Sequence, residues 1–93
     1  MKILGRTVHV QFVSLASEDY GSFSTSSSTI RINPDKSEEE MLSTLVHEVT
    51  HAIIWMIYGG ADDLTLTEEQ VCRVAELVWA HKEEIQKTLA NRE

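Results

Sequence analysis

Apolar and polar residues alternate over the N-terminal part of the chain, a pattern that predicts β-strands with one buried face. In the first such segment, residues 3–13, the apolar positions are Leu4, Val8, Val10 and Phe12. Residues 20–25 and 29–33 form two further segments, separated by a serine-rich stretch that is typical of a turn. The sequence therefore predicts about three strands, at 3–13, 20–25 and 29–33.

The second part of the chain has apolar residues at helical spacing, which predicts two long helices, at 38–58 and 68–89. The buried stripe expected for the first helix is Leu42, Leu45, Val46, Val49, Ile53, Met56 and Ile57. The stripe expected for the second helix is Val71, Val74, Ala75, Val78, Ile85 and Leu89. We expect Trp55 and Trp79 to pack between the two helices.

Capping residues set the ends of these helices. Ser37 is followed three residues later by Glu40, a capping box in which each side chain binds the other's backbone N–H group. Thr67 and Gln70 repeat this arrangement at the second helix. Gly59 ends the first helix, because glycine adopts the left-handed conformation that is common there. We therefore expect a single α+β domain over residues 1–93, with a small sheet packed on two long helices.

Charge and cysteine content narrow the function classes. The formal net charge of −7 argues against nucleic acid as the main partner, since phosphate binding needs a basic surface. Cys72 is the only cysteine, so neither an intramolecular disulfide nor a cysteine-based zinc site is expected. The sequence shows no secretory signal and no membrane span, so we expect a cytoplasmic protein.

The first helix carries an H-E-x-x-H pattern, formed by His47, Glu48 and His51. Residues four apart lie on the same helix face, so the two imidazoles can reach one metal ion. Zinc accepts neutral imidazole nitrogens and lowers the pKa of bound water. Glu48, beside the first histidine, can take a proton from that water without binding the metal. The pattern therefore predicts a zinc site with Glu48 as the general base.

A third protein ligand is expected, because catalytic zinc sites have three protein ligands and one open position. Ile57 stands where the longer form of this motif has a third histidine. We expect Glu68, at the start of the second helix, to supply the ligand, with Glu69 as the second choice and Glu76 as a weaker candidate. An alternative is that these glutamates only complement the helix dipole.

Residues 44–53, around the motif, resemble the metal-binding helix of small zincin-type metallopeptidases from phages and prophages. The likeness extends weakly over most of residues 20–90, and it is more distant to the anti-repressor metallopeptidases of mobile elements and to the SprT-like group. It implies a minimal zincin fold, His47 and His51 as zinc ligands, Glu48 as the base and a glutamate at Glu68 or Glu69 as third ligand.

The function that we expect is zinc-dependent hydrolysis of a peptide bond in a peptide or protein substrate. The strand at 29–33 would be an edge strand beside the metal, pairing with an extended substrate. Four residues are candidates to stabilise the oxyanion: Tyr20, Tyr58, Arg31 and His81. The alternative is a non-enzymatic phage protein that binds or regulates a partner and keeps zinc for folding.

Overall fold

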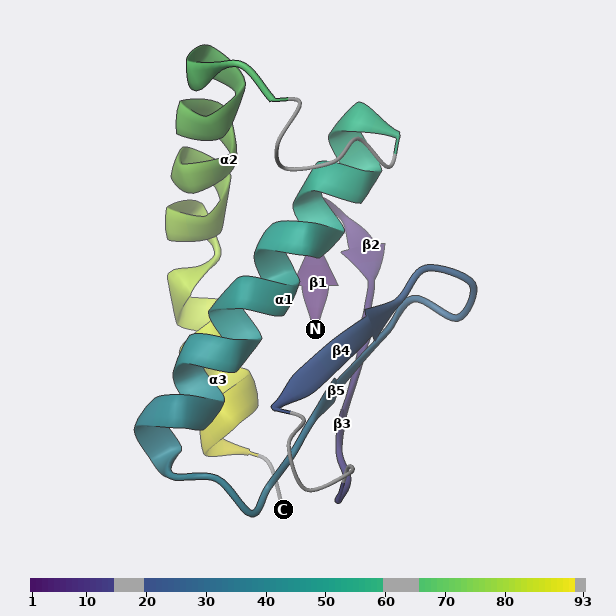
Figure 1. The fold of residues 1–93 in the computed structure, drawn as a ribbon, viewed down its shortest axis with the longest axis vertical. Coiled ribbons are helices and arrows are strands. Elements are labelled where there is room, and N and C mark those ends of the chain that lie inside the picture. Colours follow the sequence, from purple (N-terminus) through teal and green to yellow (C-terminus); the bar gives the residue numbers. More distant parts are fainter. Residues whose placement is uncertain (15–19, 60–65, 92–93) are drawn as a thin grey trace.

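The computed structural model describes residues 1–14, 20–59 and 66–91. It is an α+β structure in which helix α1 lies between a small sheet on one side and helices α2 and α3 on the other (Figure 1). The strands are β1 (Lys2–Ile3), β2 (Arg6–Thr7), β3 (His9–Phe12), β4 (Gly21–Ser24) and β5 (Thr29–Ile32). The helices are α1 (Glu38–Tyr58), α2 (Glu68–Ala80) and α3 (Lys82–Ala90). The predicted α+β class is confirmed.

Helix α1 begins and ends where the capping residues predict. The Ser37 side chain accepts a hydrogen bond from the Glu40 N–H group, and the Glu40 side chain accepts one from Ser37. At the other end Gly59 has a φ of 64°, the left-handed conformation that favours glycine. Thr67 and Gln70 form the second predicted capping box, at the start of α2. The sequence signals at these three helix ends are confirmed.

The main sheet has the strand order β3-β5-β4. Strand β5 pairs in parallel with β3 and antiparallel with β4, so it is the central strand. The expectation that residues 29–33 form an edge strand is therefore wrong. Ile30 and Ile32 of β5 are fully buried, which explains why this strand takes the central place.

The single strand predicted at 3–13 is divided into three short strands. Strands β1 and β2 form a hairpin whose two-residue turn consists of Leu4 and Gly5, with φ values of 52° and 80°. Positive φ at both positions is typical of the tight turn that matches the twist of a hairpin. The turn brings Ile3 and Val8 into the core and leaves Leu4 38% exposed, so the predicted inward position of Leu4 is also wrong.

The helix predicted at 68–89 is divided at His81 into α2 and α3. The backbone of His81, with φ −98° and ψ 9°, departs from helical values. Its N–H group is shared between the carbonyl groups of Leu77 and Val78, which keeps the bend bonded to the preceding turn. Val74, Ile85 and Leu89 of the expected stripe are buried on both sides of the bend, but Val71 is 50% exposed, so its expected burial is wrong.

The core is formed where α1 packs against the sheet on one side and against α2 and α3 on the other. Leu45, Val49 and Ile53 of α1 are fully buried. The other buried apolar residues are Ile3, Val8, Ile30, Ile32, Met41, Ala52, Ile54, Val74, Ile85 and Leu89. Among the described residues, no helix is both long and apolar enough to cross a membrane.

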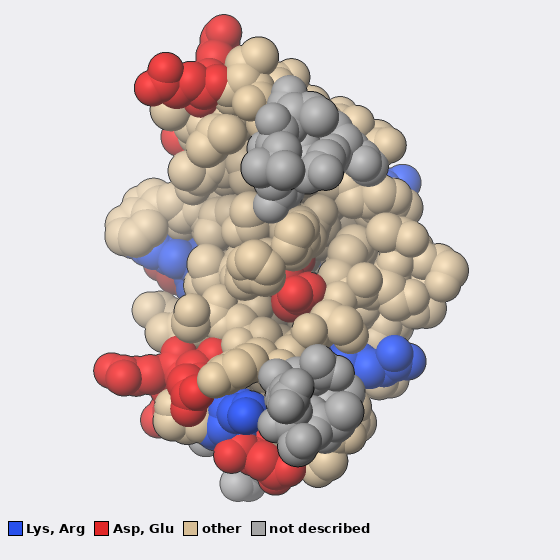
Figure 2. Space-filling model, viewed as in Figure 1, with Lys and Arg blue, Asp and Glu red and all other residues tan. Residues whose placement is uncertain are grey.

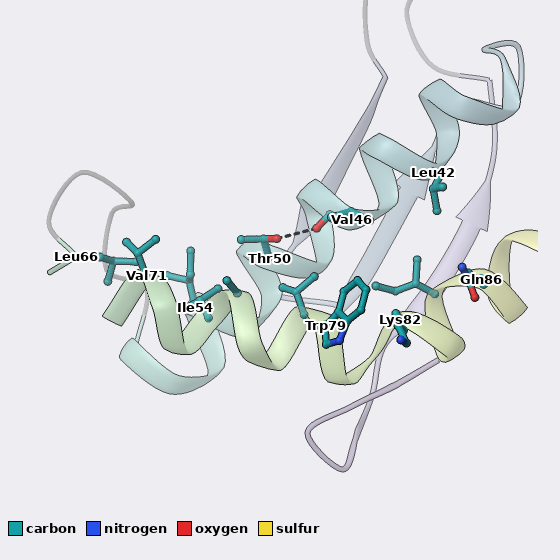
Figure 3. Close-up of a pocket in the computed structure, with 13 residues that line it drawn as sticks. Leu42, Val46, Thr50, Ile54, Leu66, Val71, Trp79, Lys82 and Gln86 are labelled. Atoms are coloured by element: carbon teal, nitrogen blue, oxygen red, sulfur yellow. Dashed lines mark hydrogen bonds between the residues drawn. The ribbon is translucent and has the colours of Figure 1, made fainter. Parts of the chain in front are cut away.

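An apolar groove of about 590 Å³ remains open between α1 and the α2–α3 pair (Figure 3). Val46 and Ile54 line it from α1, and Val71 and Trp79 line it from α2. The Trp79 side chain is 69% exposed, so the expectation that it packs between the helices is wrong. Trp55 is half-buried and packs edge-on against Phe23 of β4, with ring centroids 5.9 Å apart.

Gly21 allows strand β4 to approach α1 closely. A β-carbon at this position would lie 2.6 Å from the Arg31 carbonyl oxygen and 2.6 Å from the Thr44 methyl group. The backbone oxygen belongs to the central strand and cannot move without disturbing the sheet. Only glycine therefore fits between β5 and α1 at this point.

We predict that Gly21→Ala lowers the free energy of unfolding by about 1–3 kcal/mol, the usual cost of inserting a methyl group into a packed site. Urea unfolding measures the change. Ser22→Ala, at the next and exposed position of β4, is the matched control and should change the free energy by less than about 0.5 kcal/mol. Equal stability of Gly21→Ala and the control would contradict the close packing of β4 on α1.

Candidate metal centre

His47 and His51 lie one helical turn apart on α1, and their imidazole rings converge. The two Nε2 atoms are 2.9 Å apart, and the ring planes meet edge-on at 83°. Because both residues project from one rigid helix, the ring positions depend on side-chain rotation alone. The two Nε2 atoms thus face each other beside α1, close enough for one metal ion to bind both.

This arrangement fits a bound metal ion. Two nitrogen ligands of a tetrahedral zinc ion, each at about 2.0–2.1 Å, lie about 3.3 Å from each other. The Nε2 atoms at 2.9 Å reach that spacing with a small rotation of either ring. His47, Glu48 and His51 each place one ligand atom within 4.8 Å of the others, so the group has a donor set that could hold a metal ion.

Glu48 differs from the two histidines in its exposure to solvent. Its side chain is 7% exposed, whereas His47 is exposed and His51 is half-buried. Thr44 lies one turn before Glu48 on the same flank of α1, and its methyl group would be only 2.6 Å from a β-carbon placed at Gly21 of β4. The flank of α1 that carries Glu48 therefore faces β4, while the histidines lie nearer to solvent. A buried carboxylate next to two converging imidazoles is suited to proton transfer at the metal position.

Helix α2 carries the glutamates that were expected to supply the third ligand. Glu68 and Glu69 are both exposed, and neither lies in the described group that contains the histidines. Glu69 and Glu76 line a cavity of about 360 Å³ together with Tyr58 of α1, and Glu68 does not line it. Tyr58 follows His51 by two turns and lies on the same helix face. The cavity therefore adjoins the α1 face that carries the imidazoles.

The four residues expected to be able to stabilise an oxyanion have different surroundings. Arg31 lies on β5 between the buried residues Ile30 and Ile32, so it points to the face of the sheet opposite α1. His81 is half-buried, and both of its ring nitrogens are already hydrogen-bonded, to Leu4 and to Leu77. Tyr58 remains as a residue beside the cavity.

The Tyr20 side chain interacts with residues at the N-terminal end of α1. The Lys36 ammonium group lies 4.5 Å from the centre of its ring. Hydrogen bonds from Ser37, and also one from Tyr20, lower the pKa of the Glu40 carboxyl group below its usual range. Tyr20 therefore contributes to the N-terminal end of α1, several turns before His51.

Comparison with known families identifies the group to which the fold and the site belong. Residues 5–81 match the IrrE N-terminal-like domain, which is classed as a peptidase family. The chain belongs to the IrrE N-terminal-like domain family. This assignment confirms the resemblance to zincin-type, anti-repressor-type metallopeptidases. Neither the curated proteins nor the solved structures contain a significant match.

Membership of the IrrE N-terminal-like family gives the motif on α1 a metallopeptidase-like setting, either in a peptidase or in a regulator that keeps the zincin fold. The sequence pattern located the three motif residues correctly on one helix. It did not reveal the cavity at Tyr58, because its lining residues belong to two different helices, α1 and α2. The spacing of Glu69, Cys72 and Glu76 places them on one face of α2, and this shared face was the sequence signal from which the cavity could have been predicted.

We predict that His47→Ala weakens zinc binding by more than about 100-fold, since loss of an outer-shell partner alone costs 10–100-fold. Competition with a chromophoric chelator measures the affinity. His9→Ala, at an exposed position of β3, is the matched control and should bind zinc as the unaltered chain does. Equal affinities for His47→Ala and His9→Ala would exclude the convergent imidazoles as the metal site.

Proposed function

We propose that this domain is a zinc-dependent peptidase in which His47 and His51 hold the metal and Glu48 is the general base. The observation that carries the proposal is the pairing of two converging imidazole nitrogens with a buried carboxylate on the same turn of α1. A site that only stabilised the fold would have no use for this carboxylate, because it would need no proton acceptor. The proposed phage or prophage origin rests on the sequence resemblance, and the proposed cytoplasmic location rests on the expectation drawn from the sequence.

The third ligand in this proposal is Glu69 of α2. Glu69 lines the cavity that Tyr58 shares with the α1 face of the histidines, and this supports it over Glu68. Glu68 is three residues before Val71, which lines the apolar groove, so Glu68 is directed toward that groove. Glu76 also lines the cavity and is the alternative on the same face of α2.

Zinc, when bound, supplies a Lewis acid that polarises the scissile carbonyl group and lowers the pKa of water. Glu48 accepts the proton of the attacking water on a carboxylate oxygen. It then donates that proton to the nitrogen of the leaving amine, so the carboxylate is regenerated. Its burial against the β4 side keeps the carboxylate beside the reacting atoms rather than in bulk solvent.

Strand β4 is the proposed binding edge for an extended substrate. Among the described strands it pairs with β5 alone, so its other side has backbone groups that can accept a further strand. The Asn33 N–H group donates a hydrogen bond to the Tyr20 carbonyl group. In an antiparallel pair every second residue bonds to the partner strand, so the backbone groups of Gly21 and Phe23 point away from β5, toward the free edge of β4. The middle of this face of the molecule is uncharged apart from one acidic group near its centre (Figure 2). Recognition would therefore depend on backbone hydrogen bonds more than on substrate sequence.

We predict that Glu48→Gln lowers kcat at least about 100-fold, the usual contribution of a general base, because the amide cannot accept a proton. Cleavage of a fluorescently labelled, unstructured protein such as casein measures the rate, and zinc content is measured on the same samples. Glu39→Gln, at an exposed position of α1, should leave the rate unchanged. Full activity in Glu48→Gln would remove the base assignment, and absence of cleavage by the unaltered chain on a panel of unfolded proteins would favour a regulatory role.

We predict that Glu69→Ala loses zinc affinity by at least about tenfold while Glu68→Ala keeps it. The two positions are neighbours in the first turn of α2 and both are exposed, so each serves as the other's control. Chelator competition on both variants gives the comparison. Loss of zinc in Glu68→Ala alone would restore the first choice made from the sequence, and loss in neither would assign the third ligand elsewhere.

A further inference from the structure

His81 connects the N-terminal hairpin to the bend between α2 and α3. Its Nε2 atom lies 3.1 Å from the Leu4 nitrogen, and its Nδ1 atom lies 2.7 Å from the Leu77 carbonyl oxygen. Leu4 and His81 are far apart in sequence, so the imidazole joins two separate elements of the fold. Neither interaction involves the residues of the candidate metal centre.

These two contacts fix the protonation state of the ring. A carbonyl oxygen can only accept, so Nδ1 must carry a hydrogen and donate it to Leu77. The Leu4 N–H group can only donate, so Nε2 must be the bare, accepting nitrogen. Only the neutral imidazole with its hydrogen on Nδ1 satisfies both bonds. Addition of a proton at Nε2 would place two donors against each other.

The hydrogen bond from Leu4 to His81 supports an uncommon backbone conformation in the hairpin turn. Leu4 has a φ of 52°, in the left-handed region that non-glycine residues rarely adopt. Its side chain is 38% exposed, so burial of the side chain does little to hold the residue in this conformation. The bond to His81 therefore adds to the β1–β2 pairing in holding Leu4 in a conformation that non-glycine residues rarely adopt.

The charged groups around His81 come from the hairpin and from α3. Lys2 donates through its ammonium group to Thr7, and Arg6 lies 5.8 Å from the Trp55 ring on α1. Lys82 lies 4.0 Å from the Trp79 ring, whereas Glu84 accepts a bond from the Lys2 N–H group at 3.4 Å, next to the Leu4 contact. The neighbouring acid on α3 is Glu83, and the last turn of α2 has no charged side chain. The α1 residues that line the groove toward α2 do not titrate: Leu42, Val46, Thr50 and Ile54.

We propose that His81 is a pH-sensitive latch that holds the turn of the β1–β2 hairpin against the α2–α3 bend while its ring is neutral. Protonation removes the acceptor for Leu4, and the Glu84 carboxylate becomes the natural partner of the imidazolium, in competition with Lys2. The turn then opens locally, while Ile3 and Val8 stay anchored in the core. The latch works in the direction of acidification: it is closed at high pH and opens as the pH falls.

Amide hydrogen exchange followed by NMR on the full chain tests the latch. Between about pH 8 and about pH 5, the protection factor of the Leu4 amide should fall at least about tenfold. Its midpoint should coincide with the titration of the His81 ring, and the ring nitrogens should show the Nδ1–H tautomer at high pH. Protection factors already correct for the intrinsic pH dependence of exchange.

His81→Gln keeps a side chain that can bond but not titrate, so Leu4 protection should become independent of pH. His9→Gln, which removes a histidine from an exposed position of β3, should leave the pH dependence unchanged. The latch is refuted if Leu4 protection does not change through the His81 titration, or if the pH dependence persists in His81→Gln. Should the variant fail to fold, the tautomer and the coincidence of the two titrations in the unaltered chain decide the question.

Discussion

The burial of helix α1 on two sides is the constraint on which the rest of the structure depends. Leu45, Val49 and Ile53 form a fully buried stripe that must face the core. Once that stripe is fixed, the helical period leaves His47 and His51 on a face that reaches solvent, with Glu48 on the flank toward β4. The positions of the chemically important side chains thus follow from the packing of apolar ones.

The close contact between β4 and α1 adds the second part of the site. Gly21 lets the edge strand approach the helix near Thr44, and the Phe23 ring packs against Trp55 farther along. The strand therefore runs beside the stretch of α1 that carries the motif. The catalytic proposal and the substrate proposal both depend on this contact, since one needs a buried Glu48 and the other needs a free strand edge beside it.

Local signals allowed helix α1 to be predicted from the sequence. Its ends are set by a capping box and a glycine, and its motif needs only the regular geometry of one helix. The features that were not predicted depend on longer-range or less typical interactions. The Leu4–Gly5 turn lacks the asparagine or aspartate that usually marks such turns, and the bend at His81 contains neither glycine nor proline. Strand β5 is central because it also pairs in parallel with β3, and the alternation of apolar residues within a strand does not predict which strands pair.

Anomalous diffraction at the zinc absorption edge, on crystals grown with one equivalent of zinc, would show whether His47 and His51 together bind the metal. We expect one strong peak about 2.0–2.1 Å from the Nε2 atoms of both His47 and His51, with a carboxylate oxygen from α2 completing the protein ligands. In that structure a Glu48 oxygen lies outside the bonding distance and faces the open coordination position. Full zinc occupancy elsewhere, or a zinc ion bound by Glu48 in place of the α2 carboxylate, would contradict the account.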